Sequence, residues 1–316
     1  MEYEDNILIG GCGGGYDIFT GLPLYFRLKG RYNVFLSSFS LGDKKGFVGF
    51  EKVTDSSFVV DASIVKLDTV NLNFPEYLLA KELGEKIYCF VDDGLGHLVK
   101  DYEVLIGLSK IKTVILCDGG CDSLMRGSEE HLGTIVDDIM NVYAVRSLYL
   151  KKMVSYCYLG CLGMDVDTFI DINYSDMVDN IDRLRSVGGL IECFDLDEKE
   201  VETKKYIEIF EKCNPKFSII NCCIVGAIRG HRGNYMNSHL RERLGGKIYD
   251  KSPSIKISDI THKFHIFNLE SVVKQNLFFG KLSDYDDSDK ICDFVTEFNR
   301  VVRSEKIEYN SNSLAV

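Results

Sequence analysis

The sequence lacks the features that define several large classes of protein. Basic residues are in deficit, since 37 lysines and arginines stand against 48 acidic residues and leave a net charge of −11. A chain without a basic field does not hold a phosphate backbone, so we expect no nucleic-acid partner. No apolar run approaches the roughly 18 residues that cross a bilayer, so we expect no membrane partner. The acidic start, residues 1–5, is unlike a signal peptide and predicts a cytoplasmic protein.

Proline is also scarce, with four in 316 residues, and no long linker, internal repeat or low-complexity stretch divides the chain. Hydrophobic residues at 45% and charged residues at 27% are typical of a globular protein. A chain of this length buries about three quarters of its surface. It needs no disulfides, and the eleven cysteines are expected to be reduced and buried. We predict a single α/β domain over residues 1–316, with residues 230–316 as a smaller cap or a C-terminal extension of it.

Short apolar runs alternate with helical patterns along the chain. Helical spacing of apolar side chains is found at residues 95–108, 135–150, 177–187, 199–212 and 290–302. The runs between them are apolar on both faces, as in strands that helices cover on two sides. The alternation predicts a Rossmann-like α/β fold, with helices on both faces of a mostly parallel central sheet of about seven strands. The predicted strands are residues 7–9, 34–36, 58–60, 87–91, 114–117, 154–159 and 217–220.

A glycine-rich loop follows the first predicted strand. Five glycines occur within residues 10–15, and the order strand, glycine loop, helix lets backbone amides approach a phosphate. The dinucleotide fingerprint fails because Tyr16 and Ile18 stand where it needs glycine, and no lysine completes a P-loop. We therefore expect no NAD-dependent redox role.

The acid in this loop complicates phosphate binding. The carboxylate of Asp17 would repel a phosphate unless a cation intervened, and it could instead hold a metal, a ribose hydroxyl or an amine. We predict that Gly13, Gly14, Gly15 and Asp17 bind the ligand. The alternative is a tight turn in which Asp17 caps a backbone amide.

A long acidic loop, residues 117–134, follows the strand at residues 114–117. Loops longer than ~12–15 residues in a compact domain are usually functional or disordered. Asp118 and Asp122 flank a Gly-Gly turn, so their carboxylates could converge on a hard cation such as Mg²⁺ or Mn²⁺. The alternatives are a site for sugar hydroxyls with a carboxylate as general base, or a solvated loop in which Asp118 caps a turn. The predicted metal ligands are Asp118, Asp122 and Asp138, the predicted catalytic residues are Asp122 and Glu129, and the predicted ligand contacts are Gly119, Gly120, Arg126 and Thr134.

Other motifs give weaker signals. Two C-x₃-C spacings lack the paired CxxC pattern of a zinc site, and no G-x-S-x-G elbow marks a serine nucleophile. The basic segment at residues 227–234 could close over an anionic ligand, or it could be a surface turn. His262 and His265 lack an H-E-x-x-H context and predict a half-buried strand.

Two blocks of the sequence resemble the uncharacterised family DUF1152. The first is residues 11–17, GCGGGYD, with TGLPL at residues 20–24. The second is DGGCDSLMRGSE at residues 118–129, with LGT at 132–134 and Asp138; the family commonly shows D-G-G-T-D-S-L-x-x-G-D-E, L-G-T and E-D. In this chain Cys121, Ser128 and Asp137 stand where Thr, Asp and Glu are usual. The family carries no established activity, so the resemblance implies that both loops are sites and leaves the chemistry open.

These observations together predict an enzyme, a hydrolase or group transferase. Its substrate would be a small phosphorylated or ribosylated metabolite such as a nucleotide or phosphosugar, with a divalent metal held by the carboxylates. The alternative is a non-catalytic protein that binds or sequesters a nucleotide or other small ligand and could signal as a homo-oligomer.

Overall fold

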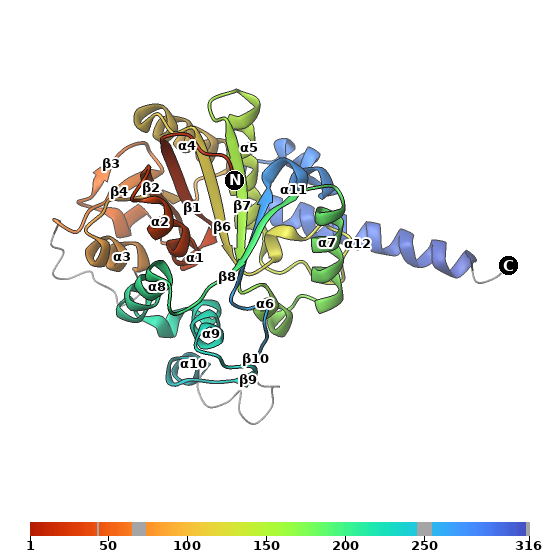
Figure 1. Ribbon diagram of the computed structural model, residues 1–316. Coiled ribbons are helices and arrows are strands. Elements are labelled where there is room, and N and C mark those ends of the chain that lie inside the picture. Colours follow the sequence, from red (N-terminus) through yellow and green to blue (C-terminus); the bar gives the residue numbers. More distant parts are fainter. Residues whose placement is uncertain (43, 65–73, 245–254, 314–316) are drawn as a thin grey trace.

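A computed structural model describes residues 1–42, 44–64, 74–244 and 255–313, without the side chains of residue 170 and residues 306–313. Five parallel strands form the centre of a nine-stranded sheet: β1 (Asn6–Gly14), β2 (Asn33–Ser40), β5 (Ile87–Val91), β6 (Thr113–Gly119) and β7 (Tyr156–Leu162). Their order across the sheet is β5-β2-β1-β6-β7. This is the doubly wound order of a Rossmann-like sheet. The predicted mostly parallel α/β fold is therefore confirmed (Figure 1).

Antiparallel strands complete both edges of the sheet. On one side β4 (Ser57–Val60) pairs with β5, and β3 (Glu51–Lys52) pairs with β4. On the other side β11 (Lys263–Asn268) pairs with β7, and β8 (Leu190–Asp195) pairs with β11. His265 lies in β11 as predicted, but this strand is largely buried rather than half-buried, and His262 lies in the turn before it.

Helices cover the two faces of the sheet because side chains alternate along each buried strand. Ile7 and Ile9 point into one core and Leu8 into the other. The first core packs against α1 (Asp17–Thr20), α2 (Leu22–Leu28), α3 (Pro75–Leu83), α8 (Val201–Lys212) and α9 (Ile219–Ile228). The second packs against α4 (Leu95–Ser109), α5 (Ile135–Leu150), α7 (Tyr174–Ser186), α11 (Leu269–Gln275) and α12 (Ser288–Ser313). In the part of the chain that the structure describes, no helix is long and apolar enough to span a membrane.

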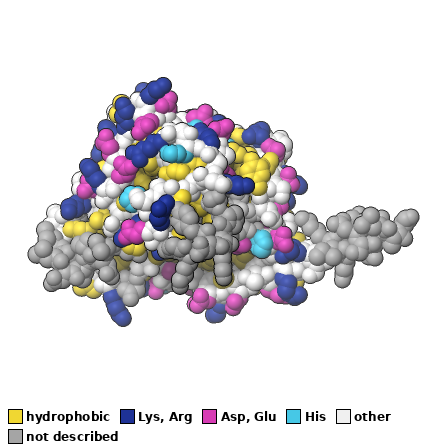
Figure 2. Space-filling model, turned by 90° about the horizontal axis from the view of Figure 1, so that it is seen from below, with side chains coloured by type: hydrophobic (Ala, Val, Ile, Leu, Met, Phe, Trp, Pro, Cys, Tyr) yellow, Lys and Arg dark blue, Asp and Glu magenta, His cyan; other side chains and the backbone are white. Residues whose placement is uncertain are grey.

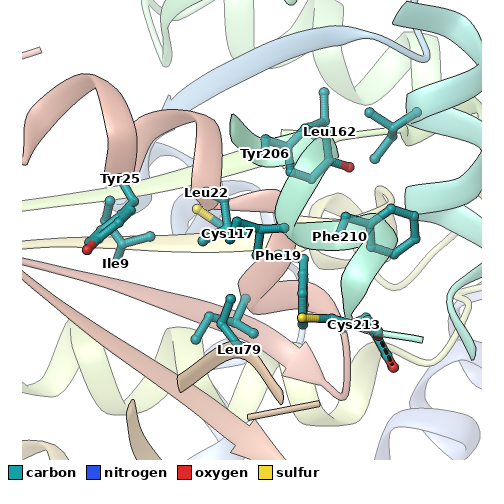
Figure 3. Packing of buried hydrophobic residues seen from close by; sticks show 14 of the residues in the cluster. Ile9, Phe19, Leu22, Tyr25, Leu79, Cys117, Leu162, Tyr206, Phe210 and Cys213 are labelled. Atoms are coloured by element: carbon teal, nitrogen blue, oxygen red, sulfur yellow. Dashed lines mark hydrogen bonds between the residues drawn. The ribbon is translucent and has the colours of Figure 1, made fainter. Parts of the chain in front are cut away.

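The first core fixes the short helix α1 that follows the glycine loop. Phe19 of α1 meets Phe210 of α8 edge-on, with 6.1 Å between the ring centroids, and Ile9 and Leu22 lie in the same cluster (Figure 3). The hydroxyl of Tyr16 donates a hydrogen bond to the carbonyl of Cys213 at 2.9 Å. These contacts hold the start of α1, and therefore Asp17, in one position.

A small group of elements lies beyond the carboxyl ends of the parallel strands (Figure 1). It contains α9, α10 (Ser238–Leu244) and a separate two-stranded sheet of β9 (Gly233–Tyr235) and β10 (Ile255–Ile257). The chain then returns to the main sheet through β11. α6 (Met164–Ile170) and the short 3₁₀ helices at Lys44–Phe47, Asp122–Leu124, Pro215–Phe217 and Phe279–Asp284 complete the described elements.

One predicted strand is wrong. Residues 217–220 form the end of a 3₁₀ helix and the start of α9. Asn214 adopts the left-handed conformation with φ 55°, and the side chain of Ser218 accepts a hydrogen bond from the amide of Asn221, which caps α9. All eleven cysteines are unpaired as expected; nine are buried, but Cys193 and Cys292 are exposed.

Candidate metal and ligand site

The two loops singled out in the sequence lie side by side where the sheet changes its winding direction. β1 and β6 are neighbouring parallel strands, and the chain leaves β1 toward α1 on one face and β6 toward α5 on the other. Open α/β sheets bind ligands at this switch point, outside the carboxyl ends of the strands. The loops are in direct contact, because the amide of Gly119 donates a hydrogen bond to Oδ1 of Asp17 at 3.2 Å.

The glycine at position 13 makes room for two carboxylates. A Cβ atom there would lie 2.9 Å from Oδ2 of Asp17 and 3.2 Å from Oδ2 of Asp138. The amide of Gly13 also donates to Oδ2 of Asp17 at 2.8 Å. The carboxylate of Asp17 thus accepts hydrogen bonds from the amides of Gly13 and Gly119. In a phosphate-binding loop these amides would donate to the ligand instead.

Three acids from separate elements converge at this point. Asp17 comes from α1, Asp118 from the end of β6 and Asp138 from the first turn of α5. One carboxylate oxygen from each lies within 4.8 Å of the other two. We call these three residues the acidic triad. Asp118 and Asp138 are 2% and 3% exposed, and Oδ1 of Asp138 has no hydrogen-bond partner among the described residues.

Two further acids border the triad and are held in place by hydrogen bonds. Asp122 accepts bonds from the amide and the hydroxyl of Thr134, at 3.0 and 2.9 Å, so Thr134 orients this carboxylate. Asp167, from α6, accepts a bond from the amide of Cys121 at 2.6 Å. The carboxylate of Asp167 fills the space that a side chain at position 120 would need, and Gly120 itself has a φ of +143°. Asp167 is not among the predicted site residues, although it follows the end of a parallel strand just as Asp17 does.

The proton affinity of these acids is raised by burial and by their mutual repulsion. Burial first, and the charge of Asp122 second, raise the pKa of Asp17 to about 7. The same two causes raise the pKa values of Asp118, Asp138 and Asp167 well above their usual range. Carboxylates this close cannot all ionise without a compensating cation. The site therefore either holds protons or holds a cation.

Two adjoining cavities open at the triad. The smaller, the acidic pocket, has a volume of about 240 Å³, and its acids are Asp17, Asp118, Asp122, Asp137, Asp138, Asp167 and Asp171. Gly13, Gly133 and Thr134 also line it. The larger, the aromatic cavity, has a volume of about 770 Å³ and is lined by Phe47, Phe74 and Phe217, with Lys45, Glu76 and Arg243 among its charged residues and Gly15 beside the loop. Gly14, Asp17, Gly119 and Ile220 line both cavities, so one ligand can extend from the first into the second.

The outer surface at this end of the molecule carries mixed charge. Figure 2 views it from below, with Lys and Arg side chains interspersed among Asp and Glu, and apolar side chains between them. The basic segment near Arg229 is paired with neighbouring acids: Arg229 with Glu211 at 2.7 Å and Arg232 with Asp259 at 2.6 Å. Neither arginine lines the two cavities.

Three predicted site residues line neither cavity. The amide of Gly120 donates a hydrogen bond to the carbonyl of Leu162 at 3.1 Å, and the predicted roles of Glu129 and Arg126 also need correction. Glu129 accepts hydrogen bonds from the amides of residues 126, 127 and 128 and from the side chain of Asn180, so it organises the loop from inside. Nε of Arg126 donates to the carbonyl of Gln275 at 3.1 Å and ties the loop to α11. Neither residue lines the acidic pocket or the aromatic cavity. A general base at Glu129 and a phosphate contact at Arg126 are not supported by this placement.

Comparisons with known proteins agree with the resemblance found in the sequence. The family model described as "Protein of unknown function (DUF1152)" matches residues 43–297, which include the acidic loop and not the glycine loop. No curated protein matches the chain. Two solved structures are similar at 11% identity: the antimicrobial reagent A40926 pseudoaglycone deacetylase Dbv21, with a TM-score of 0.39, and the zinc-inhibited form of teicoplanin deacetylase Orf2, with 0.40. They cover 85% and 83% of this chain and 99% and 98% of their own.

Proposed function

The chain belongs to the DUF1152 family of proteins of unknown function, and from its site we propose a metal-assisted hydrolase or group transferase. The proposed substrate is a small phosphorylated or ribosylated metabolite, such as a nucleotide or a phosphosugar. The acidic triad would bind Mg²⁺ or Mn²⁺ beside the reacting group. The aromatic cavity would hold the rest of the substrate.

The observation that carries the proposal is the unsatisfied carboxylate of Asp138. Its Oδ1 atom is buried without a hydrogen-bond donor among the described residues, and oxygens of Asp17 and Asp118 lie close by. A buried charge is costly unless it is paired or coordinates a metal. The triad offers carboxylate oxygens and neither sulfur nor imidazole, and such a donor set suits Mg²⁺ or Mn²⁺ better than zinc.

The chain's own residues suit transfer of a group from a phosphate-bearing substrate. When bound, a divalent cation supplies Lewis-acid polarisation of a phosphoryl oxygen and offsets negative charge. Asp122 lines the same pocket with its carboxylate oriented by Thr134, and it would accept a proton from water or from an acceptor hydroxyl. Burial raises the pKa of Asp122, against the lowering effect of the bonds from Thr134.

The aromatic cavity has the size and lining that a nucleotide or a similar metabolite needs. Its volume of about 770 Å³ lies within the ~300–1,000 Å³ common for small-molecule sites. Phe47, Phe74 and Phe217 provide flat apolar surface for a base or other apolar group. Lys45 and Arg243 bring positive charge to the same cavity, which favours an anionic substrate.

The test combines metal binding with turnover. Calorimetric titration of Mg²⁺ and Mn²⁺ is compared for the wild type, Asp118→Asn, Asp138→Asn and the exposed control Asp179→Asn. Turnover of nucleotides, ADP-ribose and sugar phosphates is followed by chromatography with and without EDTA. We expect metal-dependent turnover in the wild type and the control, with loss of both metal binding and turnover in the triad variants. Metal affinity that is unchanged in both triad variants would refute the proposed site.

A second function is favoured by the position of Glu129. Glu129 is one of the two predicted catalytic carboxylates, and both of its oxygens accept hydrogen bonds from amides of its own loop. Fewer groups therefore remain for proton transfer. A non-catalytic protein that binds or sequesters the same metabolite needs only the cation site and the cavity. Such a protein would show metal-dependent binding and would release the metabolite chemically unchanged after denaturation.

A further inference from the structure

The aromatic cavity contains a buried acid that the proposed chemistry does not use. Glu76, in the first turn of α3, is 1% exposed and lines this cavity. Its Oε1 atom accepts a hydrogen bond from the hydroxyl of Ser38 at 3.0 Å. Its Oε2 atom is buried and has no hydrogen-bond partner among the residues that the structure describes. One half of this carboxylate is thus satisfied by the protein, and the other half is not.

The position of Glu76 in the fold is informative. β2 lies next to β1, and Ser38 and Ser40 stand near its carboxyl end, one strand away from the glycine loop. In dinucleotide-binding sheets an acid near the end of this strand accepts hydrogen bonds from ribose hydroxyls. Here the strand carries serines at that point, and α3 places the carboxylate of Glu76 beside them. Ser40 and the glycines at positions 14 and 15 line the same cavity.

The surroundings of the free oxygen favour a neutral donor. Phe47, Phe74 and Pro75 line the cavity around Glu76, so a second charge brought there would lose its hydration. A hydroxyl already satisfies the first oxygen, and a hydroxyl from a ligand would satisfy the second without adding charge. Burial raises the pKa of Glu76 to about 7, against the lowering effect of its own backbone amide and of the hydroxyls of Ser38 and Ser40.

We infer that Glu76 recognises the vicinal hydroxyls of a ribose carried by the ligand and so determines its specificity for ribosylated metabolites. The inference rests on the proposed function, because it needs a ligand that runs from the acidic triad into the aromatic cavity. It narrows that function, since a phosphosugar or nucleotide without the diol would leave the Oε2 atom unpaired. Sites built to bind a substrate hydroxyl discriminate strongly against analogues that lack it.

The test compares ligands that differ by one hydroxyl. Binding of ADP and 2′-deoxyADP, and of ribose 5-phosphate and 2-deoxyribose 5-phosphate, is measured by calorimetry at pH 8 with Mn²⁺. We expect the wild type to bind each ribose compound at least tenfold more tightly than its deoxy partner. Glu76→Gln, which keeps the side chain's size, should bring both ratios close to one. Glu82→Gln, a change on the same helix at a residue paired with Lys212, should preserve them.

Each outcome separates this inference from the proposed function. Equal Mn²⁺-dependent binding of ribose and deoxyribose compounds by the wild type overturns the inference and leaves the metal-assisted function intact. This comparison needs no variant, so a folding defect in Glu76→Gln cannot obscure it. Discrimination that disappears in Glu76→Gln without any Mn²⁺ binding supports the inference and refutes the metal site. Mn²⁺ binding without binding of any of the four compounds overturns the inference together with the proposed substrate class.

Discussion

The carboxylate of Asp17, which follows β1, accepts a hydrogen bond from the backbone amide of Gly119 at the end of β6, with 3.2 Å between Oδ1 and N. One side chain thereby joins the two loops that the sequence marks as functional. The other oxygen of the same carboxylate, Oδ2, accepts a hydrogen bond from the amide of Gly13. It is therefore both a link between the loops and a member of the acidic triad, and these two roles can be separated by mutation.

The first prediction concerns Asp17→Asn. Asparagine keeps one oxygen that can accept an amide bond but loses the negative charge, so metal affinity should fall more than stability. We expect Mn²⁺ binding to weaken at least tenfold, and the free energy of unfolding to fall by about 1 kcal/mol through the loss of one hydrogen bond. Calorimetric titration and urea denaturation measure the two effects. Asp55→Asn is the control, because Asp55 is exposed and lines neither cavity. Unchanged Mn²⁺ affinity in Asp17→Asn would exclude Asp17 from the cation site.

The second prediction concerns stability against pH. Burial raises the folded-state pKa values of Asp17 and Glu76 to about 7, and burial with the charge of Asp92 raises that of Asp137 to about 6. In the unfolded chain these groups ionise near pH 4. Between these values the folded state binds more protons than the unfolded state, so the free energy of unfolding falls as the pH rises. The stabilisation is complete below about pH 4 and is lost as the pH passes 6 to 7.

Thermal unfolding in EDTA measures this effect. Between pH 5 and pH 8 we expect the Tm of the metal-free protein to fall by roughly 5 °C or more. Saturating Mn²⁺ should reduce the fall, because a bound cation favours the ionised triad. The double variant Asp118→Asn/Asp138→Asn should also show a shallower dependence, since fewer acids repel each other. A Tm that rises steadily from pH 5 to pH 8 in EDTA would contradict the raised pKa values.

The sequence predicts the architecture and the place of the site better than the roles of its residues. β1 and β6 are recognisable because Ile7 to Ile9 and Val114 to Cys117 are apolar on both faces. The parallel arrangement then brings the loops after them to one edge of the sheet. The strand predicted at residues 217–220 is wrong because a short apolar run fits a strand and a buried helix equally well. β8 is not predicted because polar and apolar residues do not follow its alternating burial: Glu192 is half-buried and Ile191 is exposed.

The individual acids illustrate why roles are harder to predict. Glu129 has the same sequence context whether its carboxylate faces a ligand or the amides of its own loop, and only the folded path of the loop decides between them. Asp167 and Glu76 reach the cavities from α6 and α3, which are distant in sequence from both loops. Only tertiary packing brings Glu76 to its cavity, whereas the position of Asp167 after the end of β7 is a signal that the sequence carries.

The third prediction follows from the inward position of Glu129. Glu129→Ala leaves three backbone amides and the side chain of Asn180 without their shared acceptor in a buried loop. The free energy of unfolding should fall by about 3 kcal/mol, as expected for hydrogen bonds to a charged group. The neighbouring Glu130→Ala, at a largely exposed side chain, should cost less than about 1 kcal/mol. Urea denaturation measures both; equal stability of the two variants would show that Glu129 does not organise the loop.

The fourth prediction separates the general base from its neighbours in the acidic pocket. If Asp122 accepts the proton, Asp122→Asn should lower kcat by about 10²–10⁴-fold, the usual contribution of a general base. Asp137→Asn, which changes an acid on the same pocket wall, is the matched comparison and should lower kcat far less. Thr134→Val keeps the shape of the side chain and removes only the hydroxyl bond to Asp122. It should lower kcat several-fold and leave KM and Tm nearly unchanged, because Thr134 acts by orienting the base.

Steady-state kinetics with the substrate identified by the turnover screen measure the effects of all three variants. A larger loss in Asp137→Asn than in Asp122→Asn would assign the base to Asp137, whose pKa of about 6 also lies near the working range of a base.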